Sequence, residues 1–146
     1  MKAIYRLQLL LHLVVGLGAL AGGYGAVSDP YAPMGIPAEA LEKGPFTSFL
    51  IPGLFLLVVL GLGNLVSAFL AARKSRLSGY ASGAMGAALA AWIVVQCWIL
   101  QSIVALHVIF FAVGAVQGLL ALALLWLRGD WPLGWIKERL AAKGAK

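Results

Sequence analysis

The side chains of this 146-residue sequence that could bind a ligand form two groups within long apolar stretches. In the first group, His107 lies near Gln96 and Gln101 along the chain, while Tyr24 and Asp29 lie at the end of an earlier apolar stretch. A neutral imidazole beside glutamine amides offers hydrogen-bond donors and acceptors without a fixed charge. This group predicts a binding site for the headgroup of a lipid, a quinone or another small amphiphile. The alternative is a set of interfacial residues that meet water.

The second group consists of His12, Asn64 and Gln117, each within a different apolar stretch. At a rise of about 1.5 Å per residue, helices would place the three side chains at a similar depth. Polar side chains are expensive to bury in hydrocarbon, so they mark either a site or a packing contact. One interpretation is a polar pocket or a proton path. We favour the other, an interhelical hydrogen-bond clamp that stabilises by about 1 kcal/mol or less per contact.

Several kinds of chemistry lack their residues in this sequence. No Asp or Glu lies within an apolar stretch, which argues against proton-coupled multidrug export, and no Arg or Lys lies there to sense voltage. Motifs of zinc proteases, nucleotide-binding loops and serine hydrolases are absent. The single Cys97 permits no intrachain disulfide. His12 and His107 are expected near opposite membrane faces, so they cannot both ligate one haem. The sequence therefore predicts no metal site and no cofactor, and nothing in it supports catalysis.

The elements that must position these residues are membrane-spanning helices. Hydrophobic residues make up 62% of the chain and charged residues 11%, well outside the range of soluble proteins. A hydrocarbon core of roughly 30 Å needs about 20 apolar residues per helix. Three stretches carry no charge, and the third is long enough for two helices joined by a tight turn near Gln101. We predict an all-α, antiparallel bundle of four transmembrane helices in a single domain, with helices at about 4–27, 46–72, 79–101 and 105–127.

The basic residues indicate how the bundle is oriented. All but one of the 11 Lys and Arg residues lie before the first span, between the second and third, or after the fourth. The exception, Lys43, lies in the loop 28–45 with Asp29, Glu39 and Glu42. The positive-inside rule predicts a multi-pass protein of a bacterial cell membrane with both termini in the cytoplasm. The net charge of +6 thus reflects topology and attraction to the lipid bilayer, and no nucleic-acid partner is expected.

The segments outside the spans carry three further predictions. The outer loop 28–45 holds four prolines, so it cannot form a regular span. We expect it to fold as a cap with a helical turn after Pro37, and the alternative is a flexible loop. Pro52 predicts a mild kink in the second helix. The cytoplasmic tail 128–146 alternates apolar and charged residues over 131–142, which is typical of a short amphipathic helix on the membrane surface. The alternative is a frayed tail.

The N-terminus has two interpretations. Basic residues followed by an apolar run and the sequence Ala19-Leu20-Ala21 are typical of a cleavable signal peptide. The apolar stretch continues past Ala21 to Val27, however, and this length favours a retained helix.

Small residues four positions apart let helix backbones approach closely. Three glycine pairs have this spacing: Gly18 and Gly22, Gly79 and Gly83, and Gly114 and Gly118. We expect them at helix packing contacts, within one subunit or with a partner. They motivate the first functional hypothesis, a non-enzymatic structural or accessory bundle that binds another membrane protein or a second copy of itself.

The region of the outer loop also carries a resemblance. The residues concerned are Asp29-Pro30, Gly35, Pro37, Leu41, Pro45-Phe46 and the run Phe49-Leu50-Ile51-Pro52-Gly53. This pattern resembles small bacterial four-helix membrane proteins and, more loosely, the DoxX-like group. The resemblance implies the four-helix fold over most of the chain. DoxX-like proteins are associated with membrane redox and quinone-linked assemblies, but no family site motif transfers to residues of this sequence.

Three functions are therefore carried forward. The first is the structural or accessory bundle. The second is the binding of a lipid, quinone or other small amphiphile under the outer loop. The third is a small transporter or channel, which the absence of charges within the spans disfavours.

Overall fold

The computed structural model describes residues 1–130, 132 and 134–136, and this part of the chain is helical without a strand. Within these described residues, four helical segments are long and apolar enough to cross a membrane. They are α1 (Lys2–Ser28), the continuous segment α2 (Leu50–Leu54), η3 (Phe55–Leu62) and α3 (Gly63–Ala72), then α4 (Ser78–Leu100) and α5 (Ala105–Arg128). The predicted all-α bundle of four transmembrane helices is confirmed. The chain is a multi-pass membrane protein.

The turn inside the long charge-free stretch falls at Gln101. This residue ends α4 in a left-handed conformation with φ of 49°, and α5 begins at Ala105. The Gln101 side chain donates a hydrogen bond from Nε2 to the carbonyl oxygen of Trp98 at 2.6 Å, which satisfies one acceptor of the last helical turn. The amphipathic helix predicted over 131–142 lies mostly outside the described residues.

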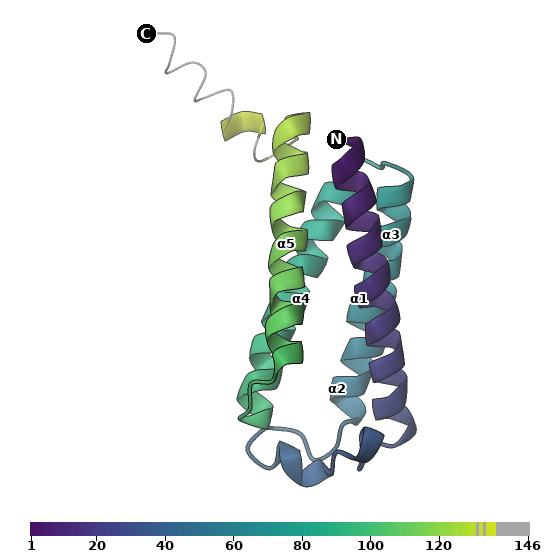
Figure 1. The fold of residues 1–146 in the computed structure, drawn as a ribbon, viewed down its shortest axis with the longest axis vertical. Coiled ribbons are helices and arrows are strands. Elements are labelled where there is room, and N and C mark those ends of the chain that lie inside the picture. The colour runs from purple at the N-terminus through teal and green to yellow at the C-terminus, as the bar shows by residue number, and fades with distance from the viewer. Residues whose placement is uncertain (131, 133, 137–146) are drawn as a thin grey trace.

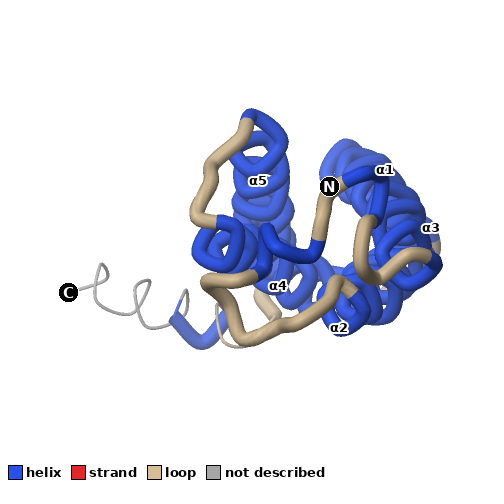
Figure 2. Tube along the Cα trace, turned by 90° about the horizontal axis from the view of Figure 1, so that it is seen from below, coloured by secondary structure: helices blue, strands red, loops and turns tan. Residues whose placement is uncertain are grey.

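The four spans form two closely packed pairs. Helix α1 runs along the α2–η3–α3 segment, and α4 runs along α5 (Figures 1 and 2). Contacts between the pairs are sparser, and those between α1 and α5 are among the fewest. The N-terminus and the end of α5 lie at the same end of the bundle (Figure 1). We call this the basic end, because Arg73, Lys74 and Arg76 lie there too, and we call the opposite end the loop end.

The loop between α1 and α2 folds over the loop end (Figure 1). It contains two short 3-10 helices, η1 (Pro33–Gly35) and η2 (Ala38–Leu41). Leu41 is buried, and Gly44 packs so closely on α4 that an added Cβ atom would lie 2.7 Å from Ile99. The loop is therefore a folded cap that covers part of the bundle.

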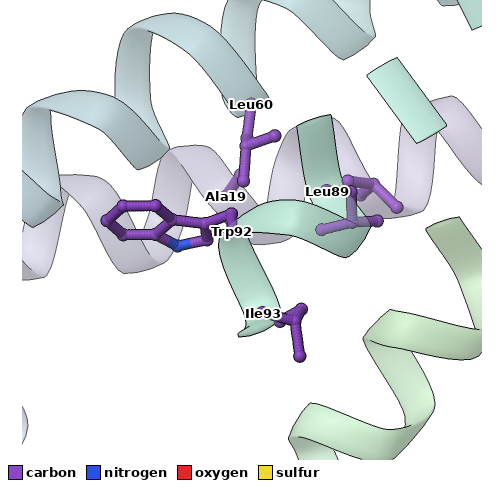
Figure 3. Close-up of a cluster of buried hydrophobic side chains, with 6 residues drawn as sticks. Ala19, Leu60, Leu89, Trp92 and Ile93 are labelled. Carbon is purple, nitrogen blue, oxygen red and sulfur yellow. The ribbon is translucent and has the colours of Figure 1, made fainter. Parts of the chain in front are cut away.

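The middle of the bundle is filled by an apolar cluster that joins the two helix pairs. Trp92 of α4 stacks on Phe55 of η3 with ring centroids 4.3 Å apart. Figure 3 shows Leu60 and Trp92 beside Ala19 of α1. The η3 segment of the second span is a π-helix that begins shortly after Pro52. The sequence predicted only a mild kink at this proline. The cluster comprises Val15, Ala19, Leu60, Leu89, Trp92 and Ile93.

Close helix contacts occur at some of the predicted glycines and not at others. A Cβ atom at Gly79 would lie 2.8 Å from Leu125, and one at Gly114 would lie 2.9 Å from the carbonyl oxygen of Gly86. Gly83 also faces α5, with Ala121 at an ordinary 3.5 Å. Helices α4 and α5 thus pack through small residues within one subunit, as the spacing of Gly79, Gly83 and Gly114 predicted.

The close approach expected at Gly18, Gly22 and Gly118 is not found. The nearest side chains to a Cβ atom would be 4.0 Å away at Gly18 and 3.9 Å away at Gly22, and Gly118 has open space within 4 Å. In α1 the close contact is made by Gly23, where a Cβ atom would lie 2.7 Å from the backbone nitrogen of Leu57. The rotation of α1 about its own axis turns Gly23, rather than Gly22, toward η3.

Candidate functional site

A cavity of about 420 Å³ lies between the two helix pairs in the loop half of the bundle. This volume is within the range of roughly 300–1,000 Å³ that is usual for small-molecule sites. Its wall is mostly apolar, and no charged side chain of the described residues lines it. The polar side chains in the wall are those of Gln96, Ser102 and His107, and the wall also includes Trp92, whose buried indole N–H has no hydrogen-bond partner in the described structure.

Local sequence explains why space remains here. Helix α1 presents Gly18, Ala19 and Gly22 to the cavity, and these small residues cannot fill the gap between the helix pairs. Toward the basic end, Val15 and Leu60 close the cavity, with 1% and 0% of their surfaces exposed. At the loop end the wall is completed by residues of the cap, among them Pro33, Met34 and Ile36.

The cavity reaches the outer surface of the bundle between α1 and α5. Gly18 and Leu106 both line the cavity and are both exposed, Leu106 by 61%. Among the described residues, the only side chain within 4 Å of the position of a Gly18 Cβ atom is the Phe110 ring, at 4.0 Å. Because the outer surface of a spanning helix faces lipid, Gly18 and Phe110 mark the side of the cavity at which a lateral entrance from the membrane would lie.

His107 is held in place by the start of its own helix. The Val104 backbone N–H donates a hydrogen bond to His107 Nδ1 at 3.3 Å, as the third residue of a helix often accepts from the capping residue. A neutral ring that accepts at Nδ1 carries its proton on Nε2. The Nε2–H group has no acceptor among the described residues, so the ring lining the cavity retains one free donor.

The structure brings Gln96 and His107 to the same cavity, but not the other three residues of the predicted ligand site. The Gln96 amide makes no hydrogen bond to a described residue. The Gln101 amide is exposed and bonded within its own turn. Tyr24 is 70% exposed, and Asp29 accepts the backbone N–H of Ala32 at 3.1 Å, and neither lines the cavity.

The second predicted group forms a buried hydrogen-bonded cluster in the basic half. His12 Nδ1 lies 2.7 Å from Asn64 Oδ1, and His12 Nε2 lies 2.7 Å from the Ser82 hydroxyl. Gln117 Nε2 is 2.9 Å from His12 Nδ1 and donates to Asn64 Oδ1 at 3.1 Å. All four side chains are fully buried. The cluster connects α1, α3, α4 and α5 at one level.

The partners of the cluster select one tautomer of His12. Asn64 Nδ2 donates to the carbonyl oxygen of Leu60 at 2.8 Å, which fixes Oδ1 as the atom that faces the imidazole. A short contact between Nδ1 and an acceptor oxygen requires the proton on Nδ1. His12 therefore donates to Asn64 and accepts the Ser82 hydroxyl proton at Nε2. In this arrangement the Gln117 amide donates to Asn64.

One helical turn closer to the basic end, the interior of the bundle holds two further buried polar side chains. Gln8 and Ser78 are each 0% exposed, and neither side chain makes a hydrogen bond in the described structure. Gln8 lies four residues before His12 on α1, and Ser78 lies four residues before Ser82 on α4, so each lies on the same helix face as the cluster residue above it.

Sequence analysis missed Ser82, Gln8 and Ser78 in this region. The four-residue spacing from His12 was the signal that could have found Gln8. Ser82 lies between Gly79 and Gly83, which the sequence analysis interpreted only as a helix packing contact. A short hydroxyl side chain serves both purposes, because it permits close packing and still donates across the helix interface.

The described residues contain no group of three His, Cys, Asp or Glu side chains that could hold a metal ion. Comparisons with protein-family models, curated proteins and solved structures found no match to this chain. The resemblance to DoxX-like proteins therefore stays a prediction.

Proposed function

We propose that this protein binds a small neutral amphiphile in the cavity of the loop half. The observation that carries the proposal is an apolar cavity of about 420 Å³ whose wall includes the His107 ring and the Gln96 amide. Apolar walls with few polar groups are typical of small-molecule sites, where the polar groups fix the orientation of the ligand.

The chemistry of the wall defines the class of ligand. A charged headgroup would be buried without a counter-charge, which is unfavourable, so the ligand is neutral. The free Nε2–H of His107 calls for an acceptor such as a carbonyl or hydroxyl oxygen, and the Gln96 amide can donate or accept. A quinone or a neutral lipid with an apolar chain has these properties.

The membrane orientation is part of the same proposal. The basic end is cytoplasmic by the positive-inside rule, since Lys43 is the only basic residue of the long loop at the other end. The cavity then lies in the outer half of the cell membrane. Its entrance between α1 and α5 would exchange ligand with the outer leaflet.

The other functional hypotheses have less support. Gly79, Gly83 and Gly114 face a helix of the same subunit, so these glycines are not free to bind a partner helix. For a transporter, the buried side chains of Val15 and Leu60 separate the cavity from the polar cluster, which leaves no continuous polar path across the bundle. Amphiphile binding therefore ranks above an accessory role and above transport.

Native mass spectrometry of the purified protein tests the proposal, with a benzoquinone that carries a decyl chain as the probe. We expect the wild-type protein to retain one probe molecule. His107→Ala and Gln96→Ala should each weaken binding by roughly 2-fold to 10-fold, the equivalent of one hydrogen bond. Gln101→Ala is the matched control, because this amide lies at the same end outside the cavity. Equal binding by all four proteins, or no retained probe, would overturn the proposal.

A further inference from the structure

A second, smaller cavity of about 120 Å³ lies at the basic end. It is formed between the first turns of α1 and the end of α3. Three of its wall residues are cationic, and one is a tyrosine. The complete wall consists of Lys2, Tyr5, Arg6, Leu9, Ala71, Ala72 and Lys74.

The three cations of this cavity are uncompensated. The side chains of Lys2, Arg6 and Lys74 form no ion pair or hydrogen bond with the described residues. Asp130, an acidic residue at the same end of the bundle, already forms an ion pair with Arg128 at 3.0 Å. Like charges that converge without a counter-ion create a local positive potential, which attracts an anion.

Tyr5 adds a donor that is already positioned. Its hydroxyl oxygen accepts a hydrogen bond from Arg128 Nη1 at 3.1 Å, and the same Nη1 donates to the carbonyl oxygen of Ser75 at 3.1 Å. The hydroxyl proton of Tyr5 has no acceptor among the described residues. The ring is buried, and Arg128, whose own charge is balanced by Asp130, holds the Tyr5 hydroxyl in place.

We infer that this cavity binds a phosphate-bearing anion. Arg6 can donate two parallel hydrogen bonds to phosphate oxygens, while Lys2 and Lys74 act as mobile point charges. Leu9 and Ala72 line the same cavity with apolar surface, which suits the glycerol or upper chain region of a phospholipid. The phosphate can come from an anionic lipid headgroup or from a free phosphate compound, and both present the same group to these side chains.

The test uses the full-length protein in detergent and measures binding by native mass spectrometry. The probes are a short-chain phosphatidylglycerol, the matched phosphatidylcholine and inorganic phosphate. We expect Arg6→Gln and Lys74→Gln each to weaken phosphatidylglycerol binding by about fivefold, since one cation near an anionic lipid contributes about 1 kcal/mol. Tighter binding of phosphatidylglycerol than of inorganic phosphate identifies a lipid site, and the reverse order identifies a free phosphate site.

Arg73→Gln is the matched control, because it removes the same charge from the same end of the bundle. Arg73 does not line the cavity, and its guanidinium lies over the Phe69 ring at 5.1 Å from the centroid. We expect the Arg73→Gln variant to bind phosphatidylglycerol as tightly as the wild-type protein does. An equal loss in the Arg73 variant, or no loss in the Arg6 and Lys74 variants, would overturn the inference. Thermal unfolding of each variant establishes that the bundle is intact.

Discussion

The Nδ1 atom of His107 accepts the backbone N–H of Val104 at 3.3 Å, so the residue that starts α5 also fixes the ring that lines the cavity. This contact links two properties that mutation can separate. It stabilises the beginning of the helix, and it leaves the Nε2 proton for a ligand.

His107→Gln should keep the helix cap, because Gln is a favourable residue at this position of a capping box. His107→Ala should lose the cap and reduce the free energy of unfolding by about 0.5–2 kcal/mol. Both variants should bind the decyl benzoquinone more weakly than wild type, the alanine variant more so. Thermal unfolding and native mass spectrometry measure the two effects. Unchanged stability of His107→Ala would show that the cap contributes nothing.

Gly18→Leu should close the lateral entrance between α1 and α5. A side chain at this position extends toward the Phe110 ring, and the backbone has room for a Cβ atom. We expect probe binding to fall by about tenfold or more, as the entrance and part of the cavity are filled, with little change in stability. Gly118→Leu is the control, because its open space lies outside the cavity wall. If Gly18→Leu bound the probe as tightly as the wild-type protein does, the entrance between α1 and α5 would be contradicted.

Loss of the cluster around His12 should affect stability more than binding. Ser82→Ala removes one interhelical hydrogen bond and should lower the free energy of unfolding by about 0.6–1.7 kcal/mol. Asn64→Leu should lower it by about 1–3 kcal/mol, because it leaves the His12 and Gln117 donors without an acceptor. Equilibrium unfolding in mixed detergent measures these differences.

Ser67→Ala is the control for these variants. The Ser67 hydroxyl is buried but donates to the Gly63 carbonyl oxygen of its own helix at 2.9 Å, so its removal breaks no contact between helices. A loss of stability in Ser67→Ala as large as that in Ser82→Ala would contradict the assignment of the cluster as an interhelical clamp.

Gln8→Met should stabilise the bundle. Both polar atoms of the Gln8 amide are buried without a partner in the described structure, and methionine has a similar shape without them. Removing an unsatisfied buried amide is expected to raise the free energy of unfolding by about 1–3 kcal/mol. Gln117→Met also removes an unpartnered buried oxygen, Oε1, but it breaks the hydrogen bond from Gln117 Nε2 to Asn64, so it should raise the free energy of unfolding less than Gln8→Met does. If Gln8→Met destabilises the protein, the Gln8 amide has a bound partner in the membrane, such as water.

Depth along a helix could be predicted from sequence, because each residue adds a fixed rise. His12, Asn64 and Gln117 were therefore placed at one level, and the structure joins them by hydrogen bonds. The charge-free stretch and its polar residues likewise located the turn at Gln101, and with it the approximate depth of His107.

Rotation about each helix axis could not be predicted, because it is set by packing against neighbouring helices. In α1 the adjacent residues Gly22 and Gly23 have the same side chain, and only the structure shows that Gly23 contacts η3 while Gly22 faces the cavity. For the same reason the sequence prediction included Tyr24 in the ligand site, whereas the rotation of α1 directs this side chain outward. The π-helix of η3 has no signal in the sequence beyond the nearby Pro52.

Photo-crosslinking tests the amphiphile site most directly. A benzoquinone whose decyl chain carries a diazirine would be irradiated with the protein in lipid nanodiscs, and the modified residues would be identified by peptide mass spectrometry. The account predicts crosslinks to cavity residues such as Leu56, Trp92 and Phe110, suppressed by excess unlabelled quinone and lost in Gly18→Leu. Crosslinks confined to outward-facing residues such as Leu119, unaffected by competitor, would contradict it.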